Sequence, residues 1–127
     1  MQEKEFSLRN RLHSFRFAFN GLKVLFQEEH NSRIHLVIAI VAIVAGFLCK
    51  ITSYEWLAIL LSLGLVISLE IVNTALEKIA DFISPQYDSR IKIIKDLAAA
   101  GVLVGAFAAV GVGLVVFGPR ILEILAV

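Results

Sequence analysis

WLAILLSLGLVISLEIVNTALEKIAD, residues 56–81, is the stretch that decides how this chain is built. Its first half is an apolar run that ends directly on a carboxylate. A row of polar side chains follows at intervals of three and four residues: Glu70, Asn73, Glu77 and Asp81. On a helix, this spacing places all of them on one face. An acid at the end of a lipid-buried helix is costly and usually faces a protein interior or a site. The row therefore predicts a functional site rather than a helix that has simply reached water.

The composition around this stretch indicates a membrane protein. The chain has 127 residues, of which 58% are hydrophobic, and its mean hydropathy is +0.82. A soluble protein averages about 45–50% apolar residues, and here the excess is gathered in blocks, which predicts an integral membrane protein. The formal net charge of +1 argues against nucleic-acid binding as the main role. The single cysteine, Cys49, excludes an intrachain disulfide and a cysteine-based metal site.

The expected fold is all-α, with three transmembrane helices and an N-terminal amphipathic interfacial helix in a single domain, residues 1–127. Apolar residues at alternating steps of four and three predict the amphipathic helix at about residues 7–28: Leu8, Leu12, Phe15, Phe19, Leu22 and Phe26. Basic residues on its other faces are typical of a helix lying in the membrane interface, although packing on a partner gives the same pattern. The spans are expected at about residues 34–50, 54–76 and 95–117.

Polar residues and helix breakers mark the ends of these spans. Residues 27–33 are expected to form a polar connection, and His35, just inside the first span, is interpreted as a polar end-residue rather than a ligand. Pro85 predicts that the second helix ends at or before the preceding residue. Ser89 is expected to cap the N-terminus of the third helix, and Gly118-Pro119 is expected to stop the third span.

Basic residues predict the orientation in the cell membrane. Ten Lys and Arg residues precede the first span or lie between the second and third, whereas only Lys50 and Arg120 lie on the other side. By the positive-inside rule, the N-terminus and the 78–95 connection are cytoplasmic and the C-terminus is outside. The acidic row then lies at the cytoplasmic surface, where a reaction of ATP with a lipid head group would need it.

A row of small residues in the third span favours close helix packing. Gly101, Gly105, Ala109 and Gly113 recur at every fourth position, which lets another helix approach closely, within one chain or between chains. Apolar spans are rich in Gly and Ala in any case, so the row does not decide between these arrangements. Three spans are too few to enclose a large internal site, which favours self-association.

The polar row can support phosphate chemistry at a membrane surface. No Walker-type, protein-kinase, Gly-x-Ser-x-Gly or HExxH pattern occurs. Glutamates that converge from different helices could hold Mg²⁺ through oxygen ligands, with phosphates completing the shell. A nearby lysine could neutralise phosphate charge during transfer.

Two non-enzymatic interpretations use the same residues. One is a small transporter with Glu70 as a proton or cation site, and the other is a structural or regulatory subunit whose basic N-terminal helix binds anionic lipid. Glu70 is expected at the surface and not at the membrane midplane, which disfavours the transporter. A structural role leaves the polar row unexplained.

Three stretches resemble the prokaryotic diacylglycerol kinase family, the small integral-membrane lipid kinases: NRLHSFRFAFNGLKVLFQEEHNSRIH (Asn10–His35), LEIVNTALEKIAD (Leu69–Asp81) and KDLAAAGVL (Lys95–Leu103). Their order and spacing match the family's across nearly the whole chain. ExxNxxxE followed by Lys-Asp at the head of the last span is a specific combination. The resemblance implies a homotrimer with shared active sites that phosphorylates a membrane lipid alcohol, with ATP as co-substrate and Mg²⁺ as cofactor.

The resemblance also implies roles for individual residues. Glu70 matches the family's catalytic base, which takes the proton of the lipid hydroxyl, and Glu29 and Glu77 match its magnesium ligands. The residues expected around the nucleotide are Arg11, Phe17, Glu29, Asn73, Glu77, Gln86, Tyr87, Asp88, Lys95 and Asp96. Those expected at the lipid substrate are Glu70, Trp56 and Ala99. Arg9, Asn10 and Arg11 could each be aligned with the family's N-terminal arginine, and Arg11 is favoured.

The substrate is expected to be undecaprenol. The RLHSF…FNGLK…EE…N…RIH pattern resembles the undecaprenol kinase branch of the family, and so does Ala98-Ala99, where the diacylglycerol branch tends to carry Gly-Ser. The product would be undecaprenyl phosphate, the lipid carrier of cell-wall precursors. The alternative is diacylglycerol, which would give phosphatidic acid. Both substrates are primary alcohols presented at the interface, so the chemistry of the site does not separate them.

Overall fold

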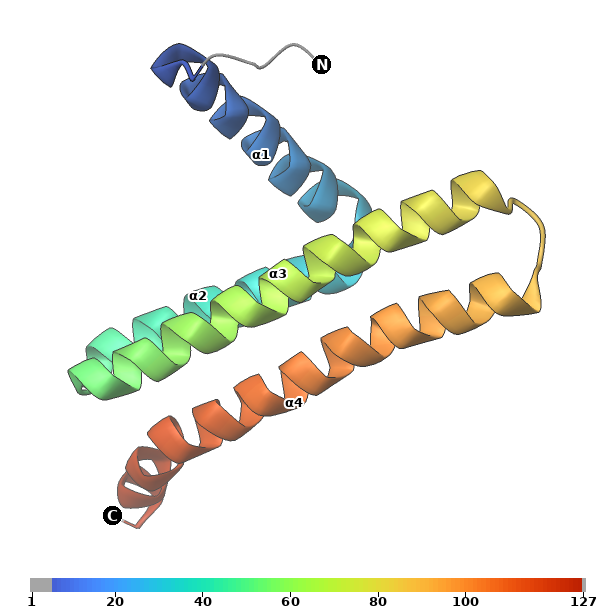
Figure 1. The fold of residues 1–127 in the computed structure, drawn as a ribbon. Coiled ribbons are helices and arrows are strands. Elements are labelled where there is room, and N and C mark those ends of the chain that lie inside the picture. Colours follow the sequence, from blue (N-terminus) through green and yellow to red (C-terminus); the bar gives the residue numbers. More distant parts are fainter. Residues whose placement is uncertain (1–5, 127) are drawn as a thin grey trace.

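The computed structural model describes residues 6–126 and builds them into four α-helices (Figure 1). They are α1 (Leu8–Glu28), α2 (His30–Leu48), α3 (Ser53–Ile83) and α4 (Ser89–Leu125). The helices α2, α3 and α4 are long and apolar enough to cross a membrane, which confirms the prediction of an all-helical chain with three possible spans. With 31 and 37 residues, α3 and α4 are about 46 and 55 Å long. Both therefore extend well beyond a hydrocarbon core of about 30 Å.

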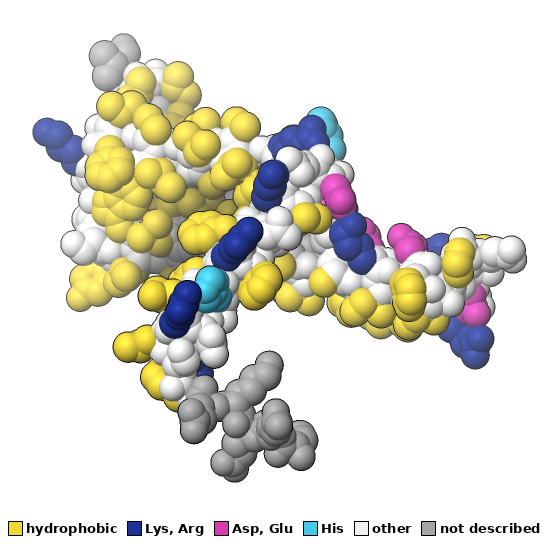
Figure 2. Space-filling view, turned by 90° about the horizontal axis from the view of Figure 1, so that it is seen from above, with side chains coloured by type: hydrophobic (Ala, Val, Ile, Leu, Met, Phe, Trp, Pro, Cys, Tyr) yellow, Lys and Arg dark blue, Asp and Glu magenta, His cyan; other side chains and the backbone are white. Residues whose placement is uncertain are grey.

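The three apolar helices lie side by side, and α1 leaves them at an angle (Figure 1). The central helix is α3, which packs most extensively on α4 and also contacts α2. The first helix meets the others near its C-terminal end, where Leu25 is buried, and its N-terminal half is exposed. Figure 2 shows a row of basic side chains along α1, beside a broad apolar surface of the other helices. The interfacial location of α1 stays a prediction.

A tight turn joins α2 to α3. Lys50 has a positive φ of 51°, and the amides of Lys50 and Ile51 donate to the carbonyls of Phe47 and Gly46. This pair of bonds is a Schellman motif, which ends a helix and folds the next residue back onto it. Ile51 accordingly lies against Gly46 and is buried. The core begins at this turn and contains Ile51, Ile59 and Val116, with Cys49 packed against them.

The connection between α1 and α2 is shorter than predicted. Residues 27–33 were expected to be a polar connection, but α2 resumes at His30, and Glu29 alone departs from helical geometry. The side chain of Arg33 explains how the chain turns so sharply. Its guanidinium donates to the carbonyl of Phe26 at 2.6 Å and also to that of Gln27, so it satisfies groups that the end of α1 would otherwise leave unpaired.

The connection between α3 and α4 agrees with one prediction and corrects another. The helix α3 ends at Ile83, as Pro85 predicted. The N-cap of α4 is Asp88 and not Ser89. The Asp88 carboxylate accepts from the backbone N–H of Arg90 at 2.8 Å, and a carboxylate at this position also interacts favourably with the positive end of the helix dipole.

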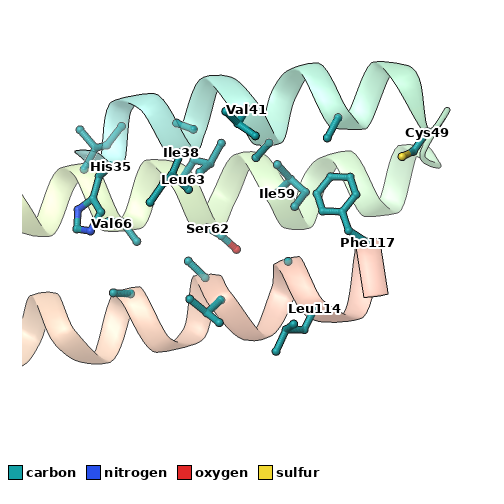
Figure 3. Close-up of a pocket in the computed structure, with 18 of the residues that line it drawn as sticks. His35, Ile38, Val41, Cys49, Ile59, Ser62, Leu63, Val66, Leu114 and Phe117 are labelled. Atoms are coloured by element: carbon teal, nitrogen blue, oxygen red, sulfur yellow. The ribbon is translucent and has the colours of Figure 1, made fainter. Parts of the chain in front are cut away.

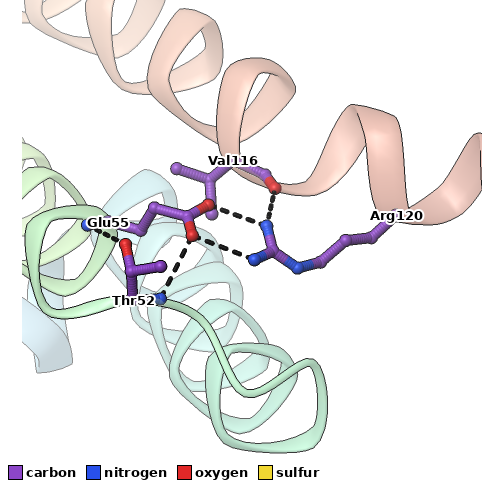
Figure 4. A network of polar contacts seen from close by, with 4 residues as sticks. All are labelled: Thr52, Glu55, Val116 and Arg120. Carbon is purple, nitrogen blue, oxygen red and sulfur yellow. Dashed lines mark hydrogen bonds and ion pairs between the residues drawn. The ribbon is translucent and has the colours of Figure 1, made fainter.

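The helix α4 continues past Pro119, contrary to the prediction that Gly118-Pro119 stops it. Proline removes one helical hydrogen bond and bends the axis, and the last turns of α4 bend away in Figure 1. Arg120 holds the chain at this bend. Its guanidinium donates to the carbonyl of Val116 at 2.6 Å and to both carboxylate oxygens of Glu55 at 2.7 and 2.9 Å (Figure 4).

Glu55 has a second role at the same end of the bundle. It forms a capping box with Thr52, because its backbone N–H donates to the threonine hydroxyl while its carboxylate accepts from the threonine amide. One carboxylate therefore caps the start of α3 and binds the end of α4 through Arg120.

The small-residue row of α4 packs within the chain at one point. A Cβ placed on Gly105 would lie 2.7 Å from Cδ1 of Leu69, so α4 approaches α3 closely there. Gly101 and Gly113 have nothing within 4 Å of such a Cβ among the residues that the structure describes. The close approach at Gly105 places α4 directly beside the polar row of α3, because Leu69 immediately precedes Glu70.

Candidate active site

Glu70 is buried, with 5% of its surface exposed. Its oxygen Oε1 contacts Nδ1 of His35, which α2 contributes. An ionised carboxylate can only accept, so the imidazole N–H donates in this contact. His35 was interpreted from the sequence as a polar end-residue. The structure adds a partner that this interpretation lacked, because the packing of α2 on α3 brings together two residues that are 35 positions apart.

Two acceptor atoms next to this contact have no partner. Oε2 of Glu70 and Oδ1 of Asn73 are buried without a hydrogen bond to any residue from 6 to 126. The two residues are one helical turn apart, about 4.5 Å along the axis. Buried acceptors are almost always satisfied, so this arrangement is suited to a donor from outside the chain, such as a substrate hydroxyl.

An apolar groove of about 500 Å³ runs from His35 along the three apolar helices (Figure 3). Its walls come from α2, α3 and α4, and include Ile38, Leu63, Val66 and Leu114. The hydroxyl of Ser62 also lines it, but this group already donates to the carbonyl of Ala58 at 2.7 Å. The groove therefore offers an apolar chain a path between the helices, with His35 at one end.

Charged residues continue from Glu70 toward the end of α3. Glu77 is two turns further on, about 10 Å along the axis, and it is partly exposed. Lys78 pairs with Glu28 of α1. On the opposite helix, Lys95 pairs with Asp81 of α3. We call this region, with Glu29 at the α1–α2 junction, the polar end of the bundle.

The structure brings only some of the predicted site residues to this region. The predicted nucleotide residues at this end come from several elements: Asn73 and Glu77 from α3, Glu29 from the α1–α2 junction, and Gln86, Tyr87 and Asp88 from the loop after α3. Asp96 lies on α4, where it pairs with Lys92 at 2.6 Å. Gly105 of α4 lies against Leu69, the residue before Glu70. Ala99 is six positions before Gly105, about 9 Å along α4, so it lies closer to the polar end of the bundle than Glu70 does.

Three predicted residues lie elsewhere in the single chain. Arg11 and Phe17 are exposed on the free half of α1, and Arg11 lies over the ring of Phe6 at 5.3 Å. Phe17 lines a small hollow along that helix. Trp56 is near the opposite end of α3 from the polar end, packed on Gly46 and Phe47, and it is about 21 Å along the axis from Glu70.

The comparison with known proteins decides the family. The description "Prokaryotic diacylglycerol kinase" belongs to a family model that matches residues 16–117. The chain belongs to the prokaryotic diacylglycerol kinase family. It is 34% identical over 108 residues to undecaprenol kinase of Bacillus subtilis, a match that covers 85% of this chain and 88% of the relative. It is 37% identical over 117 residues to diacylglycerol kinase of Synechocystis sp., covering 91% of this chain and 67% of the relative. A diacylglycerol kinase of Helicobacter pylori is 32% identical over 90 residues, which are 70% of each chain.

Membership in the diacylglycerol kinase family makes the protein a lipid kinase with ATP as co-substrate. The family match therefore supports the interpretation as an enzyme, and not the interpretations as a transporter or a structural subunit. Three apolar helices agree with a membrane protein of this family.

The donor groups at the polar end fit a magnesium ion that is shared with a nucleotide. Among residues 6–126 there is no cluster of three or more His, Cys, Asp or Glu side chains that could hold a metal by itself. Glu29 and Glu77 are both partly exposed, and neither pairs with another residue that the structure describes. Mg²⁺ is typically bound by one or two carboxylates together with phosphate oxygens and water, so two free glutamates are a suitable donor set for this kinase family.

The sequence did not predict two contacts near the site of this kinase: that of His35 with Glu70 and that of Lys78 with Glu28. His35 was the only charged or strongly polar residue inside the first apolar run, and that exception was the available signal. Lys78 follows Glu77 directly but carried no signal of its own, because its partner Glu28 lies 50 positions away.

Proposed function

We propose that this lipid kinase transfers the γ-phosphate of ATP to the hydroxyl of undecaprenol and forms undecaprenyl phosphate. The observation that carries the proposal is the buried Glu70, which has one carboxylate oxygen unpaired among residues 6–126 and contacts His35 at the end of a long apolar groove. A polyprenol has the matching form, a single hydroxyl at the end of an apolar chain. The similarity to the undecaprenol kinase of Bacillus subtilis supports the choice of substrate.

The tail of the lipid would occupy the groove, with the hydroxyl at Oε2 of Glu70. This oxygen would accept the hydroxyl proton as the lipid oxygen attacks the γ-phosphorus, and the bond from that phosphorus to the β-phosphate bridging oxygen would break to release ADP. Asn73 would help to orient the reacting groups. Catalysis would come mostly from positioning and charge neutralisation, as in other phosphoryl transfers.

The nucleotide would bind at the polar end of the bundle. Glu29 and Glu77 would hold Mg²⁺, which when bound neutralises phosphate charge. The side chain of Lys95 would approach the phosphates, and for this it must leave Asp81. Further nucleotide contacts are proposed for Asp96 and for the loop at Gln86, Tyr87 and Asp88.

The assembly and the membrane orientation are also part of the proposal. In a homotrimer, the free half of α1 could reach a neighbouring subunit, which would bring Arg11 and Phe17 to a shared nucleotide site although they are remote from it in one chain. The excess of basic residues supports a cytoplasmic N-terminus and polar end in the cell membrane, where ATP is available. Ala99 and Trp56 would contact the lipid at different depths.

Diacylglycerol is the second candidate substrate. The 37% identity to the diacylglycerol kinase of Synechocystis sp. favours it, and a diacylglycerol also presents a primary hydroxyl above apolar chains. The groove is compatible with either lipid.

The test is phosphoryl transfer from labelled ATP by the purified protein in mixed micelles with Mg²⁺, with undecaprenol and diacylglycerol offered separately and in competition. We expect preference for undecaprenol, and loss of nearly all turnover in the Glu70→Gln variant without loss of folding. Preference for diacylglycerol would replace the substrate assignment. Near-normal turnover by Glu70→Gln would remove Glu70 from the role of base.

A further inference from the structure

We propose that His35 is a positioning residue of this kinase, which holds the Glu70 carboxylate so that Oε2 faces the lipid hydroxyl. The inference rests on the proposed function, because it assigns a role relative to the proposed base. His35 belongs to the first apolar helix, and nothing in the sequence pattern joined it to the polar row of α3. The assignment rests on three features of the structure: the contact, the unpaired oxygen and the groove.

The contact fixes one oxygen of the base and leaves the other free. Oε1 of Glu70 contacts Nδ1 of His35, which is the donor when the carboxylate is ionised, whereas Oε2 is buried and unpaired within the described residues. A carboxylate without this donor could rotate about its last torsion and exchange its two oxygens, since such sp³–sp² torsions are broad. The imidazole removes that freedom and presents Oε2 in one direction.

His35 also lines the groove, at the end of the groove that is nearest Glu70. Its side chain is 27% exposed, while that of Glu70 is 6% exposed, so the ring is more accessible than the base it contacts. Figure 3 shows His35 at one end of the lining residues, with its ring among the helices. A lipid whose tail lies along the groove would bring its hydroxyl end past this ring. His35 therefore adjoins both the proposed base and the proposed path of the substrate.

In the part of the chain that the structure describes, the His35–Glu70 contact is the one hydrogen bond or ion pair between α2 and the polar row of α3. Among residues 6–126, no lysine or arginine pairs with Glu70, and the ion pairs of the polar end involve α1, α3 and α4. The position of the carboxylate thus depends on how α2 packs on α3. A misplacement of about 1 Å in a reacting group can lower the rate by about 100-fold, so loss of this donor is expected to act on turnover.

The test uses two amide variants that place a donor at different ring positions. The amide nitrogen of His35→Asn can replace Nδ1, because both atoms are bonded to Cγ, whereas the amide of His35→Gln reaches the position of Nε2. We expect His35→Asn to keep kcat within about 10-fold of the wild type, and His35→Gln and His35→Leu to lose on the order of 100-fold. KM for ATP should change by less than about 2-fold in all three variants, because His35 lies about 9 Å along α2 from Glu29, which is proposed to hold the Mg-nucleotide.

A purely structural role would give a different pattern. If His35→Leu keeps the wild-type kcat, or if His35→Asn loses as much as His35→Leu while both are folded, the assignment is overturned. In a Glu70→Gln background, His35→Leu should cause no further loss, because residues that act as a unit are not additive. An additional loss of 100-fold in that background would also overturn it.

A measurement on the wild-type protein keeps the inference testable if the variants do not fold. The ¹⁵N spectrum of histidine-labelled enzyme should show a protonated Nδ1 for His35, and an unprotonated Nδ1 would exclude the donor role. Failure of this inference is distinct from failure of the proposed function. An active wild type with an inactive Glu70→Gln variant and a normal His35→Leu variant would reject His35 alone, whereas an active Glu70→Gln variant would reject the base itself.

Discussion

Gly46 is the position where a single methyl group should have the clearest effect on stability. A Cβ added there would lie 2.7 Å from Cη2 and 2.9 Å from Cζ2 of Trp56, and 3.1 Å from Cδ1 of Ile51. Carbon atoms pack best at about 3.5–4.0 Å, so these neighbours must move. The Trp56 ring is large and already packs on Phe47, with ring centroids 4.8 Å apart. Ile51 is fixed by the Schellman turn.

The expected magnitude follows from two opposing terms. Overpacking a well-filled site costs about 1–3 kcal/mol, while replacing a helical glycine by alanine gains at most about 1 kcal/mol. The variant Gly46→Ala should therefore be less stable than the wild type by up to about 2 kcal/mol. Any effect on activity should fall on the KM for the lipid, because Trp56 is proposed to contact the lipid and lies about 21 Å along α3 from Glu70.

The partner variant is Trp56→Leu, which removes the two ring atoms that the new methyl group would meet. In that background, Gly46→Ala should cost little or should stabilise by up to about 1 kcal/mol. Unfolding by titration with a denaturing detergent in micelles measures all four proteins of this cycle. The matched control is Gly64→Ala, because a Cβ there has nothing within 4 Å among the residues described. Equal destabilisation by Gly46→Ala with and without Trp56 would refute the steric explanation.

Two further predictions concern the polar end. Glu77→Gln should raise the Mg²⁺ concentration needed for half-maximal activity. The control variant Glu28→Gln should not, because Glu28 is paired with Lys78. An equal response in both variants would count against a metal role for Glu77. Asp88 caps α4, and its hydrogen bonds from the side chain and backbone of Arg90 hold the pKa of its carboxyl below the usual value. A lowered folded-state pKa contributes stability at neutral pH that is lost as the pH falls through that pKa, below about 4. The protection factors of the amides at the start of α4, which correct for the intrinsic pH dependence of exchange, should therefore fall in acid for the wild type and respond less in Asp88→Asn. Identical acid profiles of protection would contradict this.

The sequence predicted those features of the fold that depend on local patterns. Apolar runs predicted the three long helices, and Pro85 predicted the end of α3 correctly, since a proline restricts the residue before it. The same local reasoning expected Gly118-Pro119 to stop the last helix, and there it was wrong. The structure continues the helix because Arg120 binds Glu55, 65 positions earlier in the chain, and no local rule contains that interaction.

The candidate site also combines features that follow from local spacing with contacts between distant parts of the chain. The spacing of Glu70, Asn73 and Glu77 on one helix could be read directly, because helical periodicity determines which residues share a face. The contact between His35 and Glu70 could not, since it depends on the register in which α2 packs against α3. Under the proposed homotrimer, whether Arg11 reaches the nucleotide depends on a neighbouring subunit, which a single sequence does not position.

The position of the groove has a kinetic consequence. The helices α3 and α4 are joined at one end by the chain and the Lys95–Asp81 pair, and at the other end by Arg120 and Glu55. Groove residues from α2 and α4, such as Ile38 and Val110, are also exposed at the surface, so under the proposed function a lipid would enter sideways from the bilayer. The enzyme would then respond to the number of substrate molecules per unit area of membrane rather than per volume of solution. Adding inert phospholipid at constant total substrate should slow it by dilution in two dimensions.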